Sequence, residues 1–227
     1  MTYQFDFSFV AEYWPRFLQG ALVTAELAAS STVLGFLLGT ACALGSTSRS
    51  KWLRGAVGVY VEIIRNTPML VQLFLVFFGL ASLGLKLSVT TSAVIGLVIN
   101  IGAYSTEIVR AGIESVKKGK IEAAECLALT RWQVLHRVVL PTAIERVYPA
   151  LTSQYVLLML GTSTASQISA EELTAVSNMV NSDTFRSFEV FLVAAALYLA
   201  LSFLMRGIFW LLSRVVFKRH RVLGTPI

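Results

Sequence analysis

The chain has 227 residues, of which 56% are hydrophobic and only 14% are charged, and its mean hydropathy is +0.70. A soluble domain carries about 25% charged residues, so this composition excludes an ordinary soluble protein and favours a membrane protein. The formal charge of +6 is compatible either with a nucleic-acid partner or with basic cytoplasmic loops between spans, and the positions of the charges decide between them.

Apolar runs near the roughly 20 residues that a helix needs to cross hydrocarbon predict an all-α membrane protein with about five transmembrane helices. An aromatic-rich lead-in over 1–15 suits the headgroup layer, where rings are half wet. Nothing in it resembles a basic signal peptide, so we expect the first span itself to direct insertion. The spans are expected at about 17–44, 57–83, 89–109, 147–168 and 188–212, within one transmembrane domain over 1–227 whose membrane-spanning core is 17–213.

The Lys and Arg residues are distributed unevenly between the two sides of these spans. The loops after spans one and three are basic, as is the tail with Arg214, Lys218, Arg219 and Arg221. The N-terminus and the loops after spans two and four carry few basic residues. The positive-inside rule therefore places the N-terminus outside and the C-terminus in the cytoplasm, and it explains the net charge without a nucleic-acid partner.

Residues that would indicate a metal site or catalysis are scarce. Cys42 and Cys126 have no CxxC partner, and His136 and His220 lie in basic segments without an evident nucleophile, so we predict no metal site and no catalytic site. The chain also lacks a GxxxxGK[ST] phosphate-binding loop. We therefore expect no cofactor in this chain.

The polar segment over 110–146, between spans three and four, carries the most specific pattern. Glu122-Ala123-Ala124 predicts a short amphipathic helix, Thr130 is a candidate N-cap, and Pro141 is expected to stop a second helix. From spacing alone, a helix that merely lies on the membrane surface is an equally good interpretation.

The same segment resembles the cytoplasmic signature of bacterial ABC importer permeases: EAA, three residues, Gly, nine residues, Ile, one residue, Leu-Pro. Glu122-Ala123-Ala124 and Leu140-Pro141 match at the full spacing, while Ala128 and Val138 stand where the family has Gly and Ile. The resemblance implies a coupling helix that docks on a separate ATPase, and that ATPase would bind ATP and Mg²⁺. The ATPase-coupling residues would be Glu122, Ala123, Ala124, Leu127, Ala128, Arg131 and Trp132.

Flanking motifs resemble the polar amino acid subfamily of these permeases. They are Arg65-Asn66-Thr67-Pro68 with Gln72, and Gly102-Ala103-Tyr104 with Glu107 and Arg110. The resemblance implies a multi-pass protein of the bacterial inner membrane that moves a polar amino acid. Its partners would be a cytoplasmic ABC ATPase dimer, a second permease subunit and an external solute-binding protein.

Polar residues within spans are costly and each needs a reason. Glu26 in span one either reaches the outer interface or faces the pathway. For Glu62 with Arg65, and for Glu107 with Arg110, the three-residue spacing favours local ion pairs. The hydroxyls and amides of span four either pack helices together or bind substrate. The candidate pathway residues are Glu26, Thr67, Gln72, Gln154, Gly161, Thr162, Ser163, Ser166 and Gln167.

Many members of the family carry a Lys-Asp or Lys-Asn pair before the Thr-Ser of span four, where this chain has Leu160-Gly161. This subunit is therefore either the weaker-binding half of a heterodimer, or one in which Gly161 breaks the helix and offers backbone groups to the ligand. The alternative function is an ion-coupled secondary transporter. That class shows two related halves, and no such internal repeat is evident here.

Overall fold

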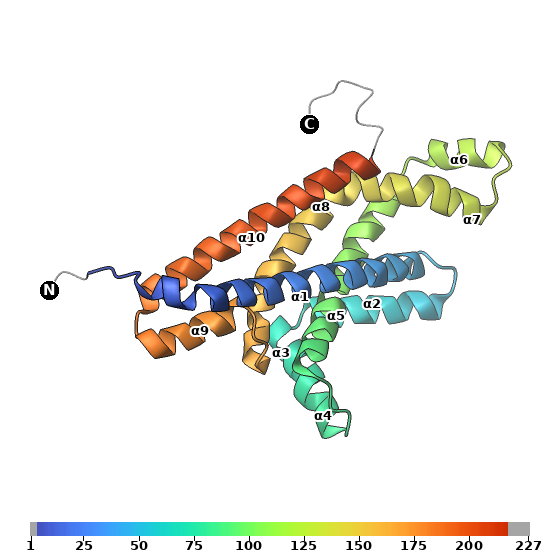
Figure 1. Ribbon diagram of the computed structural model, residues 1–227. Coiled ribbons are helices and arrows are strands. Elements are labelled where there is room, and N and C mark those ends of the chain that lie inside the picture. The colour runs from blue at the N-terminus through green and yellow to red at the C-terminus, as the bar shows by residue number, and fades with distance from the viewer. Residues whose placement is uncertain (1–3, 218–227) are drawn as a thin grey trace.

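The structure is a computed structural model that describes residues 4–217, and these residues form helices with no strand among them. Figure 1 shows α1 (Phe9–Ser46) running the length of the molecule, with α10 (Ser187–Val216) and α8 (Leu140–Gly161) above it. The predicted basic tail beyond Phe217 lies outside the described residues. The all-helical prediction is confirmed.

Within the described residues, α1, α5 (Val89–Glu114) and α10 are each long and apolar enough to cross a membrane. A fourth candidate is the pair formed by α2 (Lys51–Arg65) and Met69–Ser82, which contains α3 (Met69–Phe74), the π-helical turn η1 (Leu75–Gly79) and α4 (Leu80–Ser82). The protein is therefore a multi-pass membrane protein, in which α8 does not meet the same length and hydropathy test. The number of spans and their orientation remain predictions.

The second span, expected at 57–83, is interrupted, because α2 and the segment that follows bend by 110° at Asn66–Pro68. One expected helix end is wrong. The helix after Thr130 is not stopped by Pro141. It continues from α7 (Arg131–Val134) through the π-helical turn η2 (Leu135–Val139) into α8. Proline is tolerated there because it lies in the first turn of α8, after a turn whose hydrogen bonding is already irregular.

Small residues allow α1 and α5 to pack closely. A Cβ added at Gly35 would collide with the side chain of Ile101, and one added at Gly39 would meet the Ser105 Cβ and lie 2.9 Å from the Gly102 carbonyl oxygen. Such close backbone approach is the usual way in which helices associate where lipid replaces water, because the gain comes from van der Waals contact. The outward face of α10, by contrast, exposes Phe203 and Leu204 by 63% and 60%.

The connection between η3 (Thr162–Ile168, a 3₁₀ helix) and α10 contains the helix α9 (Leu173–Thr184), anchored by a fully buried carboxylate. Glu172 caps α9 by accepting a hydrogen bond from the Ala175 N–H at 2.9 Å, and it accepts another from the Tyr198 hydroxyl at 2.7 Å. Burial raises the pKa of this carboxyl above its usual value. The network joins α9 to α10 at the end of the molecule opposite the hairpin described next (Figure 1).

Candidate functional site

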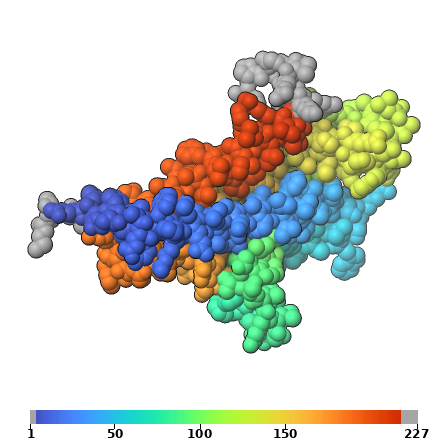
Figure 2. Space-filling model, in the orientation of Figure 1, coloured from blue at the N-terminus to red at the C-terminus, as the bar shows by residue number. Residues whose placement is uncertain are grey.

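A helical hairpin made of α6 (Lys118–Cys126) and α7 projects from the end of α5, at the upper right in Figures 1 and 2. The end of α6 is closed by two backbone hydrogen bonds, from Ala128 N–H to the Glu125 carbonyl and from Leu129 N–H to the Ala124 carbonyl. This pair defines a Schellman motif, in which the residue after the cap takes the left-handed conformation. Ala128 does so, with φ +57°.

The requirement for a positive φ explains why the family has glycine at this position. Glycine adopts φ near +57° without a steric penalty, whereas a Cβ costs roughly 1 kcal/mol there. Ala128 therefore keeps the turn at a cost in stability, instead of changing its shape.

The start of α7 confirms the predicted N-cap at Thr130, and it adds a reciprocal capping box with Gln133. The Thr130 hydroxyl accepts a hydrogen bond from the Gln133 N–H, and the Gln133 side-chain oxygen accepts one from the Thr130 N–H at 2.8 Å. Both termini of the turn are thus held by local bonds, which gives the hairpin a defined shape.

The hairpin packs one face on the protein and leaves the other exposed. Ala124 is buried with Val116, Val134, Val139 and Ala143. Leu127 and Trp132 are 77% and 68% exposed. Of the seven predicted coupling residues, Ala124 faces the core, and the exposed ones are Glu122, Ala123, Leu127, Ala128, Arg131 and Trp132. This end of the molecule therefore presents an apolar pair bordered by charges, which suits docking to another protein.

The predicted pathway residues do not form a single site. Glu26 is exposed on α1 and Gln154 lies on α8, and neither side chain has a hydrogen-bond partner among residues 4–217. Thr67 and Gln72 lie together at the break between α2 and α3. The remaining group lies where α8 gives way to η3: Gly161, Thr162, Ser163, Ser166 and Gln167.

One sequence interpretation had Gly161 break the helix, but α8 ends there and continues directly as the 3₁₀ helix η3. The hydroxyl of Thr162 donates to the Met159 carbonyl and that of Ser166 to the Ser163 carbonyl, both at 2.7 Å. Thr162 is fully buried. These donors are used within the helix, whereas the Ser163 hydroxyl has no hydrogen bond to the described part of the chain.

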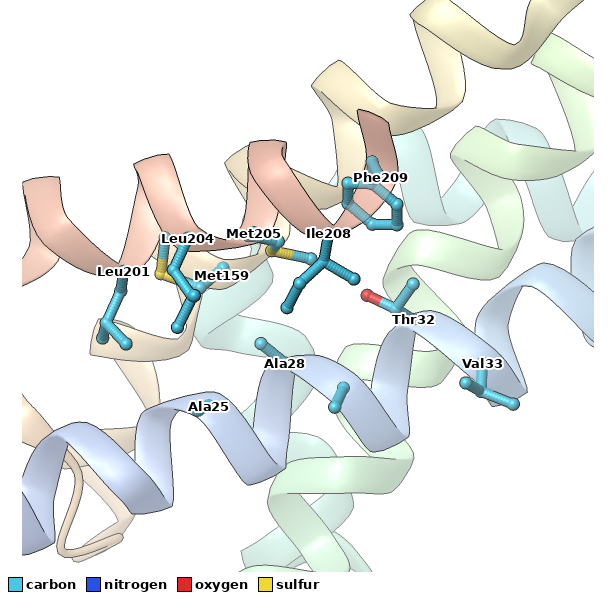
Figure 3. A pocket seen from close by; sticks show the side chains of 11 residues that line it. Ala25, Ala28, Thr32, Val33, Met159, Leu201, Leu204, Met205, Ile208 and Phe209 are labelled. Atoms are coloured by element: carbon cyan, nitrogen blue, oxygen red, sulfur yellow. The ribbon is translucent and has the colours of Figure 1, made fainter. Parts of the chain in front are cut away.

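An apolar groove of about 290 Å³ lies between α1, α8 and α10 (Figure 3). Alanines of α1 face Leu201, Met205 and Ile208 of α10 across it, and Met159 lies between them from α8. Thr32 supplies the one hydroxyl of the lining, and no charged side chain takes part. A ligand with both an ammonium and a carboxylate has no counter-charge there, so this groove is not a candidate for a polar substrate.

Sequence reasoning missed Asn100, which lies in the middle of α5 and donates a hydrogen bond from its side-chain amide to the Gln72 side-chain oxygen at 2.9 Å. The signal was available, because an amide within an apolar span is costly unless it is paired. The expected Glu62–Arg65 pair is wrong: among the described residues, Arg65 pairs with Glu107 at 3.7 Å. The Glu107–Arg110 pair is confirmed at 2.7 Å.

Comparison with known proteins gives these features a context. The family model described as "Binding-protein-dependent transport system inner membrane component" matches residues 32–218. The chain is 35% identical over 208 residues to the nopaline transport system permease protein NocM of Agrobacterium fabrum, covering 87% of this chain and 86% of NocM. It is 36% identical over 194 residues to the L-cystine transport system permease protein TcyB of Bacillus subtilis, covering 85% and 83%.

A solved structure described as an amino acid ABC transporter with histidines superposes with a TM-score of 0.84 at 33% identity, covering 93% of this chain and 99% of that one. The fold and the hairpin thus define a transporter subunit of the ABC permease class and not an enzyme. The chain belongs to the family of binding-protein-dependent transport system inner membrane components.

Proposed function

We propose that the chain is the membrane-spanning permease of an ATP-driven ABC importer for a polar amino acid, located in the bacterial inner membrane. The observation that carries this proposal is the α6–α7 hairpin, which is capped on both sides of its turn and exposes Glu122, Leu127 and Trp132. Relatives named as nopaline, cystine and glutamine permeases support the substrate class.

In this proposal the exposed hairpin face docks on a cytoplasmic ABC ATPase. Buried aromatic anchors dominate binding energy at interfaces, so Trp132 supplies the main contact and Glu122 an ion pair with a basic group of the ATPase. ATP and Mg²⁺ belong to the ATPase. Because α5 leads directly into α6 through Ser115–Lys117, movement of the hairpin is transmitted to the spans, which is the mechanical requirement for alternating access.

The proposed topology has five spans, with α8 and η3 as the fourth, the N-terminus outside and the hairpin in the cytoplasm. The Lys and Arg residues of the segments at 49–54, 110–146 and beyond 213 support it. A second permease subunit, identical or homologous, completes the pathway, and an external solute-binding protein delivers the amino acid, as the family description suggests. Ser163, Gly161 and Gln167 at the α8–η3 junction are the pathway residues that we favour.

The test purifies the chain with its co-encoded ATPase and partner permease in lipid, and measures ATP hydrolysis stimulated by the loaded binding protein. Glu122→Lys and Trp132→Ala are expected to lose ATPase association and stimulation. Trp52→Ala is the matched control, because Trp52 is 91% exposed but lies outside the hairpin, at the start of α2. Unchanged stimulation in both hairpin variants, or a wild-type preparation without an ATPase, would overturn the proposal and favour a self-contained transporter.

A further inference from the structure

The break in the second span leaves backbone carbonyl groups without helical partners. α2 ends at Arg65, α3 begins at Met69, and the axis turns by 110° between them. Pro68 has no N–H, so the regular ladder of hydrogen bonds cannot cross this point. In a membrane-spanning segment an unpaired carbonyl costs several kcal/mol, so such a break persists only where other groups replace the missing donors.

Gln72 supplies part of these donors from the first turn of α3, beside the Thr67 N–H and hydroxyl, which also lie 3.4 Å from the Ile64 carbonyl oxygen. Its side-chain nitrogen lies 2.8 Å from the Ile64 carbonyl oxygen, 3.0 Å from the Thr67 carbonyl oxygen and 2.9 Å from the Thr67 hydroxyl. An amide nitrogen carries two hydrogens, so both are engaged, by Ile64 near the end of α2 and by Thr67 within the break. Gln72 is only 6% exposed.

The oxygen of the same amide is also used, since it accepts the hydrogen bond from Asn100 of α5. Gln72 therefore joins the end of α2, the start of α3 and the middle of α5 through one side chain. Few hydrogen-bonding positions remain on it for a ligand, which disagrees with its assignment from sequence as a pathway residue.

Asn100 connects this junction to the helix that leads to the hairpin. It lies on α5, the helix that packs along α1 at Gly35 and Gly39 and that ends just before the α6–α7 hairpin. A bond between the break and this helix fixes where α3 stands relative to the element that carries the hairpin.

We propose that Gln72 is a positioning residue for transport: it holds the break between α2 and α3 and ties it to α5 through Asn100, and it does not contact the transported amino acid. The role rests on the importer function proposed above. Because Gln72 does not bind the substrate in this proposal, its loss is expected to leave the KM for transport unchanged.

The first experiment measures the geometry of the break without requiring transport. Spin labels are placed at Gly58→Cys and Ser82→Cys, two exposed positions on either side of the break, in a chain whose Cys42 and Cys126 are replaced by alanine. The distance distribution is expected to be narrow in this background. It should broaden in Gln72→Met, which keeps the length of the side chain and removes its hydrogen bonds. Gln19→Met is the matched control, because it makes the same substitution at an exposed position of α1, outside the break.

The second experiment measures uptake of labelled L-glutamine and L-cystine by the reconstituted complex, and uses whichever the wild type transports. Gln72→Met is expected to lower the maximal rate about tenfold with KM within about twofold, since it removes positioning and not substrate binding. Asn100→Leu should have the same effect to a smaller degree. The double variant should be no worse than Gln72→Met, because both changes break one network.

A rise in KM of about tenfold with an unchanged distance distribution would make Gln72 a substrate ligand and overturn the proposal. Wild-type distances and kinetics in Gln72→Met would overturn it as well. If Gln72→Met does not assemble, Asn100→Leu decides by the same two measurements, since it keeps every bond that Gln72 donates. If the wild type transports neither amino acid, the result contradicts the proposed substrate class. The spin-label result still decides the role of Gln72.

Discussion

Arg65, the last residue of α2, forms its ion pair with Glu107 of α5 and not with Glu62, one turn before it. The Arg65 guanidinium also lies 5.6 Å from the centre of the Tyr104 ring, which belongs to α5 too. Glu62 instead accepts a hydrogen bond from the Asn66 side chain at 3.0 Å. Arg65 therefore connects two helices where a local pair would have stabilised only one.

This arrangement predicts different effects for the two carboxylates. Glu107→Gln is expected to destabilise the protein by about 1–2 kcal/mol, because Glu107 also accepts two hydrogen bonds from Arg110 and charge-assisted bonds are the stronger kind. Glu62→Gln should change stability by less than about 0.5 kcal/mol. Thermal unfolding in detergent, followed by tryptophan fluorescence, measures both. Equal losses of stability in the two variants would show that the ion pair between α2 and α5 contributes no more than the local hydrogen bond of Glu62.

Ala128→Gly is expected to stabilise the hairpin by about 1 kcal/mol, because it removes the penalty of a Cβ at φ +57°. Ala123→Gly is the matched control. It lies in the same short helix with an exposed side chain, and the same change there should destabilise by about 1 kcal/mol. The signs of the two shifts in unfolding temperature test the conformation of the turn directly. A loss of stability in Ala128→Gly would contradict the left-handed turn.

Gly39→Ala is expected to destabilise the protein by about 1–3 kcal/mol, because the new methyl group would meet Ser105 and the Gly102 backbone of α5. The control is Gly58→Ala in α2, where nothing lies within 4 Å of the new Cβ and a gain of about 0.5–1 kcal/mol is expected. Both effects can be read from thermal unfolding of the purified chain. Tolerance of alanine at Gly39 would argue against close packing of α1 on α5.

The buried carboxyl of Glu172 predicts a pH dependence of stability. Its pKa is raised in the folded state, chiefly by burial, so the unfolded chain loses this proton first as pH rises. Stability is therefore expected to fall as pH rises from the unfolded pKa of about 4.5 through the folded pKa, and to level off above it. Glu172→Gln, which cannot ionise, should remove this dependence and raise the unfolding temperature at pH 7. Unfolding temperatures of both proteins between pH 4 and 8 provide the measurement, and parallel curves would exclude the effect.

Features that depend on a few consecutive residues were predictable. The N-cap at Thr130 was predicted from its residue type and position, and the Gln133 side chain that completes the capping box lies only three residues away. At Gly161, by contrast, the sequence suggested a break, and the structure has a change from α-helix to 3₁₀ helix. The prediction that Pro141 stops a helix is wrong for a local reason as well, because helix propensity does not indicate the π-helical turn before Pro141.

The amino-acid sequence by itself determined that this is a helical membrane protein with a capped, exposed hairpin, because apolar run length and capping act over one or a few turns. Only the tertiary structure decided what the polar residues within the spans do. Gln72 and Arg65 find their partners on α5, 28 and 42 positions further along the chain, and no local pattern records such a pairing. Polar groups in a membrane must be satisfied by whichever helix packs beside them, so their roles are fixed by packing and not by spacing.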